Sequence, residues 1–172
     1  RNAGREPPVL YRTLGNAPAM LKAWVDMAWP LRSEPETDRG LRELLIMRVA
    51  QLTDAAFEWV AHWDMAVHSG VSIEQLHALS TWRDSDLFDE QERAALAVTD
   101  ESTTDIGASD AAMDELARHF EPGPVVELVL TAAFYNCVSR TLRTLGLEPD
   151  PDDERLSVLR GAGGRSSGAP SS

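Results

Sequence analysis

The segment Phe57 to Gly70, with the sequence FEWVAHWDMAVHSG, constrains the fold more than any other part of the chain. At about 100° per residue it forms a helix whose faces can be assigned. One face, extended back by two residues, holds Ala55, Glu58, Trp59, His62, Ala66 and Ser69, and the opposite face holds Phe57, Val60, Asp64 and Val67. Because apolar side chains cover most of the circumference, we expect this helix to be buried.

Apolar residues at helical spacing predict further helices on both sides of this segment. They cover residues 16–30, 38–52, 73–79, 89–99, 109–120 and 122–145. Asn16 is the predicted cap of the first helix and Pro30 its predicted end, while Thr53 and Asp54 are predicted to cap the central one. No alternating run predicts a strand, and residues 32–37 and 82–88 are predicted loops. The predicted fold class is an all-α, antiparallel helical bundle.

Length and composition favour one domain followed by a tail. The 172 residues, of which 43% are hydrophobic, suffice for one buried core. We place the domain at residues 1–148. From Pro149 the chain is acidic and then rich in glycine and serine, with too little apolar surface to hold itself in place. We therefore expect residues 149–172 to be mobile or to lie on a neighbouring subunit.

The charge and the single cysteine narrow the class of partner. A net charge of −12 argues against nucleic acid or an anionic membrane as partner, although a few local arginines can still bind a small acid. No run approaches the length of a membrane span, and no signal-peptide pattern is present. Cys137 has no internal disulfide partner. A cytoplasmic setting is the expectation.

Two glutamates and a histidine are the candidate chemical groups. Glu58 and His62 are four residues apart, so their side chains can meet on one helix face. A carboxylate and an imidazole can move protons near neutral pH, but the same pair also occurs as a purely structural contact. Glu43 lies among apolar neighbours on the preceding helix. It either has a buried partner or faces solvent near the helix start, and the sequence leaves both open.

An ordered set of short motifs resembles a known family. The motifs are Arg42-Glu43-Leu44, FEWVAH, Gly70-Val71-Ser72, Phe88-Asp89 with Glu92-Arg93, and Tyr135-Asn136 with Arg140. Over roughly residues 10–148 this set resembles the carboxymuconolactone decarboxylase family, which includes the AhpD-like alkylhydroperoxidases. The resemblance implies an all-helical, AhpD-like fold and a homo-oligomer, either a trimer or a hexamer.

The resemblance separates two kinds of chemistry. In the peroxidase branch the corresponding helix carries C-x-x-C-x-x-x-H, with a glutamate one helix earlier. When that histidine is aligned with His62, the two cysteines fall on Ala55 and Glu58, and the earlier glutamate falls on Glu43. Neither thiol is present, so the nucleophile for peroxide is missing. Cys137 is distant in the sequence, and thiol peroxidase activity is not expected.

The decarboxylase branch has a Glu-Trp pair followed by the histidine, as Glu58, Trp59 and His62 do here. The resemblance implies a lyase that removes CO2 from a small carboxylated lactone or related organic acid without a cofactor. We expect His62 to return the proton to carbon, with Glu58 or Glu43 orienting the ring or acting as a second acid.

Several residues are candidates to bind the acidic substrate. Arg42, Arg48 and Arg140 can hold a carboxylate in a bidentate manner, and Arg42 is favoured because it adjoins Glu43. Trp59 is a candidate pocket wall and Tyr135 a candidate hydrogen-bond donor to the lactone. Each has a plain alternative, which is a surface ion pair for the arginines and core packing for the aromatic residues.

Three other functions remain open at this point. The chain can be a non-catalytic helical oligomer that binds a ligand or a partner. It can be a different lyase, isomerase or cyclase with the same proton donor. His62 with two glutamates can also ligate a divalent ion, although no metal site is our expectation. A small acidic substrate and further copies of the chain are the expected partners.

Overall fold

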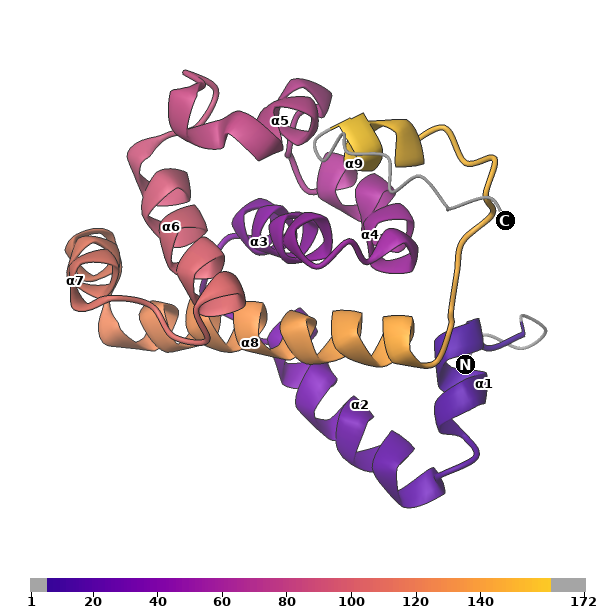
Figure 1. Ribbon diagram of the computed structural model, residues 1–172. Coiled ribbons are helices and arrows are strands. Elements are labelled where there is room, and N and C mark those ends of the chain that lie inside the picture. Colours follow the sequence, from indigo (N-terminus) through magenta and orange to yellow (C-terminus); the bar gives the residue numbers. More distant parts are fainter. Residues whose placement is uncertain (1–5, 162–172) are drawn as a thin grey trace.

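The computed structural model describes residues 6–161 and contains helices and no strand in that range (Figure 1). The elements are α1 (Val9–Leu14), α2 (Pro18–Ser33), α3 (Arg39–Leu52), α4 (Ala56–His68), α5 (Ile73–Ala78), the 3-10 helix η1 (Leu79–Asp84), α6 (Glu90–Thr104), α7 (Asp110–His119), α8 (Pro122–Thr144) and α9 (Leu156–Gly161). The predicted all-α class is confirmed.

The central helix is α3, around which α4, α6 and α8 pack (Figure 1). Every residue of α3 from Gly40 to Ala50 is buried. The helix α4 is buried on one face only, which holds Glu58, Trp59, His62, Trp63 and Ala66, while Ala61 and Asp64 are exposed. The sequence therefore predicted the inward face of α4 correctly, but the helix that is surrounded on all sides is α3.

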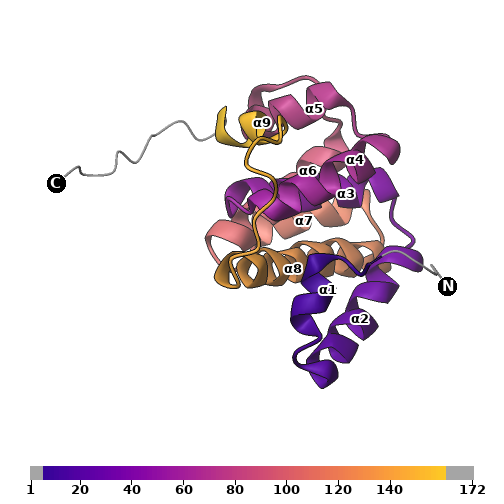
Figure 2. The same ribbon diagram turned by 90° about the vertical axis from the view of Figure 1, so that its right-hand side faces the viewer.

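A second layer lies on the other side of α8 from α5 and α9. Here α1 and α2 pair with each other, and α2 leans on α8 (Figures 1 and 2). Leu10 and Ala28 from this layer join Ile46 of α3 and Phe134 and Tyr135 of α8 in a distinct apolar cluster. This cluster brings the end of α2 close to the side chains that face α4.

Close packing between α3 and α4 depends on Gly40. A Cβ atom at this position would lie 2.6 Å from the carbonyl oxygen of Ser69 and 2.9 Å from Oδ1 of Asp38. Asp38 is the N-cap of α3 and accepts a hydrogen bond from the Leu41 amide at 3.1 Å. The backbone at the end of α4 therefore leaves no space for a side chain at the start of α3.

We expect the Gly40→Ala variant to be less stable than the wild type by about 1–2 kcal/mol. Overpacking costs about 1–3 kcal/mol, and the higher helix propensity of alanine offsets up to about 1 kcal/mol of it. Urea unfolding followed by circular dichroism measures the difference. Gly107→Ala is the control, because no atom lies within 4 Å of a Cβ built there, and it should change stability little. Equal stabilities of the two variants would contradict the packing at Gly40.

Two predicted helix ends differ from the structure. Pro30 lies inside α2, which continues to Ser33, because its fixed φ suits a helix and only one backbone hydrogen bond is lost. Asn16 does not cap α2; its side chain donates to the carbonyl of Thr13. The cap position of α4 is Ala55, which makes no side-chain cap.

The residues predicted to cap α4 belong to the preceding turn. The hydroxyl of Thr53 donates to the carbonyl of Val49 at 2.7 Å, at the end of α3. Asp54 takes a left-handed conformation, with φ of 51°, that reverses the chain direction between the two helices. Both residues therefore end α3 rather than begin α4.

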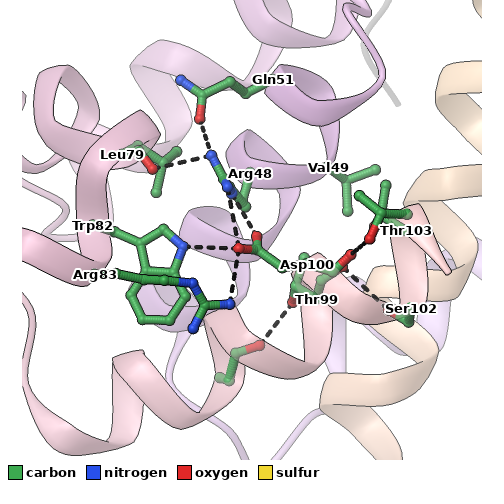
Figure 3. Close-up of polar contacts among 12 residues, drawn as sticks. Arg48, Val49, Gln51, Leu79, Trp82, Arg83, Thr99, Asp100, Ser102 and Thr103 are labelled. Carbon is green, nitrogen blue, oxygen red and sulfur yellow. Dashed lines mark hydrogen bonds and ion pairs between the residues drawn. The ribbon is translucent and has the colours of Figure 1, made fainter. Parts of the chain in front are cut away.

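A buried ion pair connects α3, η1 and α6 (Figure 3). Arg48 donates from Nε to Oδ1 of Asp100 at 2.6 Å and from Nη2 to Oδ2 at 3.1 Å. Oδ2 also accepts from Nε1 of Trp82 at 3.1 Å and from Arg83 at 3.4 Å. Arg48 donates further to the carbonyl of Leu79. The segment 82–88, predicted to be a loop, thus begins inside η1 and is fixed to the core.

The end of the described chain also differs from the prediction. Residues 156–161 form α9, and Leu156 and Leu159 are buried in the core beside α4. Nε1 of Trp59 donates to the carbonyl of Arg155 at 2.9 Å, and Arg155 pairs with Asp64 at 3.0 Å. The expectation of a mobile tail is therefore wrong for this segment, and residues 162–172 lie outside the described part.

By length and hydropathy, α8 is the one helix within residues 6–161 that meets the requirements of a membrane span. Half of its apolar window is buried, and it packs on α3 and α6. This burial is typical of the core helix of a bundle.

Candidate functional site

Glu43, Glu58 and His62 form a closed group between α3 and α4. Nδ1 of His62 lies 2.7 Å from Oε2 of Glu43, and Nε2 lies 3.0 Å from Oε1 of Glu58. The three side chains are 0%, 5% and 6% exposed for Glu43, Glu58 and His62 respectively. The imidazole therefore has one carboxylate at each of its two nitrogen atoms. We call these three residues the histidine triad.

The helices place the triad in a simple way. Glu58 lies in the first turn of α4 and His62 one turn later on the same buried face, as their spacing implies. Glu43 lies in the middle of α3, where that helix faces α4. The alternative in which Glu43 faces solvent is wrong, because its side chain is fully buried.

Arg39 completes a row of alternating charges. It lies one turn before Glu43 on α3 and forms an ion pair with it, with a third of its own side chain exposed. The contacts run in the order Arg39, Glu43, His62, Glu58, so a cationic group alternates with an acidic one along the row. Buried charges are tolerated when each has a partner of opposite sign, and this row satisfies that condition when His62 is protonated.

The surroundings favour a protonated His62 at neutral pH. Burial lowers the pKa of the imidazole, but the hydrogen bonds and charges of Glu43 and Glu58 raise it more, to about 9. Burial raises the pKa of Glu43, but the hydrogen bonds and charges of His62 and Arg39 lower it by more. The net shift of the pKa is downward, so the carboxyl group is ionised. A protonated His62 thus directs one N–H group toward each of the two glutamates.

Tyr135 of α8 contacts the same imidazole. Its ring meets that of His62 edge-on, with 5.1 Å between the ring centroids. The hydroxyl group is buried and has no hydrogen-bond partner among residues 6–161. Burial raises the pKa of Tyr135 to about 12 although the nearby Arg32 opposes this, so the phenol is neutral and can donate. An unpaired buried hydroxyl costs about 1–3 kcal/mol, which marks this position as unusual.

Two of the arginines predicted to bind substrate have structural partners. Arg42 is buried and donates to the carbonyl and to Oγ1 of Thr37, which fixes the segment before α3. Burial and the neighbouring Arg39 lower the pKa of Arg42. Arg48 is engaged by Asp100. Neither guanidinium group is directed at His62.

Of the other predicted binding residues, Arg140 lies on the surface, and Trp59 shares the buried face of α4 with Glu58 and His62 but has other partners. Arg140 is exposed on α8, donates to Asn136 and lines two surface pockets of about 620 and 600 Å³. Trp59 is fully buried, packs on Trp63 with 5.5 Å between centroids and donates to Arg155. Trp59 is therefore a core residue that anchors α9.

The sequence did not single out two arginines at the site. Arg39 had a recognisable signal, because it precedes Glu43 by four residues on one helix. Arg32 falls in a predicted loop, because Pro30 is the predicted end of the first helix. In the structure Arg32 lies in the last turn of α2, donates from Nη1 to the Tyr11 hydroxyl at 2.9 Å and lies beside Tyr135.

Sulfur and metal chemistry have little support in this arrangement. The two positions of the peroxidase cysteines are Ala55 and Glu58, and Cys137 is exposed on α8. Within residues 6–161 no group of three or more His, Cys, Asp or Glu side chains is arranged to hold a metal ion. Both ring nitrogens of His62 already face carboxylates. The arrangement is suited to proton transfer.

Comparisons with known proteins agree with the fold. Residues 18–101 match the carboxymuconolactone decarboxylase family. The uncharacterised protein YnjA of Escherichia coli is 30% identical over 139 residues, covering 80% of this chain and 70% of YnjA. The uncharacterised YdfG of Bacillus subtilis is 28% identical over 134 residues, covering 76% of this chain and 89% of YdfG.

Two solved structures have a fold similar to that of this chain. A protein of unknown function from Agrobacterium tumefaciens, suggested to be the antioxidant defence protein AhpD, superposes with a TM-score of 0.73 at 26% identity, covering 80% of this chain and 95% of that one. The debrominase Bmp8 superposes with a TM-score of 0.75 at 19% identity, covering 88% of this chain and 81% of Bmp8. The second match shows a shared fold only.

Proposed function

Because the chain belongs to the carboxymuconolactone decarboxylase family, we propose that it is a thiol-free lyase that decarboxylates a small organic acid. The substrate class is a carboxylated lactone or a related acid with a carbonyl group next to the reacting carbon, and no cofactor takes part. The observation that carries the proposal is the placement of His62, which has a glutamate at each ring nitrogen and the buried Tyr135 ring against its edge.

The proposed reaction needs one proton and no oxidant. Loss of CO2 leaves an electron pair on the carbon that held the carboxylate, and the conjugated carbonyl oxygen accepts it as an enolate. The neutral Tyr135 hydroxyl would donate a hydrogen bond to that oxygen, where the negative charge develops. His62 would then transfer its proton to carbon, and solvent would return a proton to the imidazole.

The two carboxylates have different roles in this proposal. Glu43 is fully buried and is itself paired with Arg39, so its contact with Nδ1 fixes the ring. The contact between Nε2 and Glu58 is longer, at 3.0 Å against 2.7 Å. We therefore assign Nε2 as the atom that gives its proton to the substrate, after its contact with Glu58 has broken. Because the triad side chains are at most 6% exposed, entry of substrate requires local movement around Tyr135.

Carbon dioxide release from a panel of carboxylated lactones and β-keto acids tests the proposal. In D2O the product should carry one deuteron at the carbon that lost the carboxylate, as detected by NMR. Absence of CO2 release across the panel, with a correctly folded protein, would favour a second candidate. That candidate is a non-catalytic helical oligomer, and the nearly complete burial of the triad is the observation in its favour.

We expect activity to be lost as pH rises through about 9. His62 donates only when protonated, and its pKa is raised to about 9 by Glu43 and Glu58 after burial has lowered it. The contribution of His62 protonation to the stability of the fold is also lost as pH rises. It is fully present below the unfolded-state pKa of about 6.5 and is lost as pH rises through 9. The pH dependence of kcat measures the first effect.

The Glu43→Gln variant tests the cause of that pH limit. Glutamine keeps a hydrogen-bond acceptor beside Nδ1 of His62 but carries no negative charge, so the pKa of His62 should fall. The descending limb of the kcat–pH profile should therefore move to lower pH. An unchanged limb would show that another group titrates.

A homo-oligomer, a trimer or a hexamer, is part of the proposal. Large apolar side chains remain exposed on α2 and α8: Met20, Met27, Trp29 and Val126 are 62%, 47%, 63% and 56% exposed. Surfaces of this kind commonly mark contacts between subunits. Analytical ultracentrifugation measures the assembly state, and a monomer at all concentrations would contradict this part. A cytoplasmic location also remains part of the proposal.

A further inference from the structure

Arg32 is a partly buried cation without an acidic partner. No carboxylate within residues 6–161 lies within ion-pair distance of its guanidinium group, although acidic residues far outnumber basic ones in the chain. Its guanidinium group donates to the hydroxyl of Tyr11 at 2.9 Å and lies beside that of Tyr135. By contrast, Arg39, Arg48 and Arg155 each have a carboxylate partner. An arginine in this position is equipped to bind an anion from outside the chain.

A second observation also indicates a ligand at this place. The Tyr135 hydroxyl is buried, with the residue 2% exposed, and no described group lies in full hydrogen-bonding geometry to it. The Arg32 guanidinium group is near enough to lower the pKa of Tyr135 against the effect of burial. Since Tyr135 also meets His62 edge-on, Arg32 and Tyr135 form a continuous path from the end of α2 to the triad. A carboxylate held at Arg32 would therefore lie close to the Tyr135 hydroxyl.

The space next to Arg32 is an apolar pocket between α1 and α2. It has a volume of about 340 Å³ and is lined by Leu21, Val25, Ala28 and Trp29, with Arg32 and Tyr11 at its polar end. Pockets for small ligands occupy roughly 300–1,000 Å³ and combine an apolar wall with a few polar groups. The volume suits a body about the size of one aromatic ring. Among residues 6–161 the lining includes Arg32 as its one cation and no acidic side chain, which favours an anion.

We propose that the α1–α2 pocket binds an organic acid, with its carboxylate on Arg32 and an apolar ring or short chain against Val25, Ala28 and Trp29. Its link to catalysis, through Tyr135 and His62, rests on the proposed function; the binding itself does not. The carboxylate on Arg32 is the one that the product retains. The departing carboxylate loses its negative charge as CO2 forms, so a cation beside it would stabilise the substrate more than the transition state. Acids without a carbonyl group next to the reacting carbon, such as benzoate and phenylacetate, therefore bind without reacting.

Binding of simple acids and their uncharged amides tests the site. The probes are benzoate and phenylacetate, with benzamide and phenylacetamide as analogues of the same shape, measured by isothermal titration calorimetry on the full chain. We expect the acids to bind the wild type with a Kd of about 1 mM or lower. We expect the amides, and the acids with the Arg32→Gln variant, to bind at least about tenfold more weakly.

The matched control is Arg12→Gln. Arg12 lies on α1 in the same layer, but it is exposed and paired with Glu6, so this variant makes the same charge change outside the pocket and should bind the acids as the wild type does. Arg32→Lys keeps the charge without the planar fork and should bind with intermediate affinity. It also keeps the test informative should Arg32→Gln fail to fold, as judged by circular dichroism.

Several results would overturn the proposal. The first is that the wild-type protein binds neither acid up to about 10 mM. The second is that acids and amides bind with equal affinity. The third is that Arg12→Gln and Arg32→Gln weaken acid binding equally. The two proposals can fail separately. Acid binding that depends on Arg32, without CO2 release from any substrate, supports the pocket and contradicts the lyase. CO2 release by a protein whose acid binding does not depend on Arg32 supports the lyase and contradicts the pocket. Acid binding that depends on Arg32, together with CO2 release that Arg32→Gln leaves unchanged, contradicts the link between the pocket and catalysis.

Discussion

The His62→Gln variant is expected to retain about 1% or less of the wild-type kcat for decarboxylation. General acid catalysis by a positioned side chain contributes about 10²–10⁴-fold, and glutamine cannot deliver a proton at neutral pH. Because the proton comes from Nε2 after CO2 has left, the loss should lie in kcat and not in KM. Rates of CO2 release from a defined substrate, measured on folded protein of the correct assembly state, check this prediction.

The control for this variant is on the same helix. His68→Gln changes an exposed histidine six residues later, whose Nδ1 contacts the Asp64 carbonyl, and it should keep full activity. Removing the imidazole also leaves Glu43 and Glu58 without their shared cation, so stability must be measured beside activity. A folded His62→Gln variant with wild-type turnover would remove His62 from the mechanism.

The Asp100→Ala variant is expected to lose about 3–5 kcal/mol of unfolding free energy, the usual cost of removing one partner of a buried ion pair. Asp100 is 14% exposed and Arg48 is 10% exposed, so water replaces little of the lost interaction. Without Asp100, the Arg48 guanidinium is left uncompensated next to the core, and the Trp82 indole N–H loses its acceptor (Figure 3). The effect should be large because three elements meet at this carboxylate.

Chemical denaturation of Asp100→Ala, compared with Asp26→Ala, gives the measurement. Asp26 pairs with Lys22 on the exposed side of α2, with 59% and 77% of the two side chains exposed. Exposed pairs of this kind contribute about 0.3–0.5 kcal/mol, so the control should unfold almost as the wild type does. Similar midpoints for the two variants would show that the Arg48–Asp100 pair contributes little to the fold.

Helical periodicity predicted the parts of the fold that depend on one helix at a time. It assigned Glu58 and His62 to the buried face of α4, because residues four apart must lie on one side of a helix. It could not decide whether Glu43 was buried, because that depends on how α3 crosses α4. Close approach of those two helices, allowed by Gly40, is a tertiary property.

The errors came from signals that the surrounding fold overrides. Pro30 is a common helix terminator, yet α2 passes through it, and the last turn that follows is where Arg32 lies. The segment from Pro149 has few apolar residues, but Leu156 and Leu159 are enough to bury α9 because α4 offers a matching surface. Composition does not reveal such a partner surface in advance.

The hydrogen bond between Trp59 and Arg155 joins residues that are 96 positions apart in the chain. During synthesis, therefore, the helix that carries Glu58 and His62 emerges long before the segment that covers its outer side. Until that late segment docks, the indole N–H of Trp59 lacks its acceptor, the Arg155 carbonyl. We expect removal of the chain after residue 148 to have the same effect, so the last step of folding joins one of the first helices to one of the last.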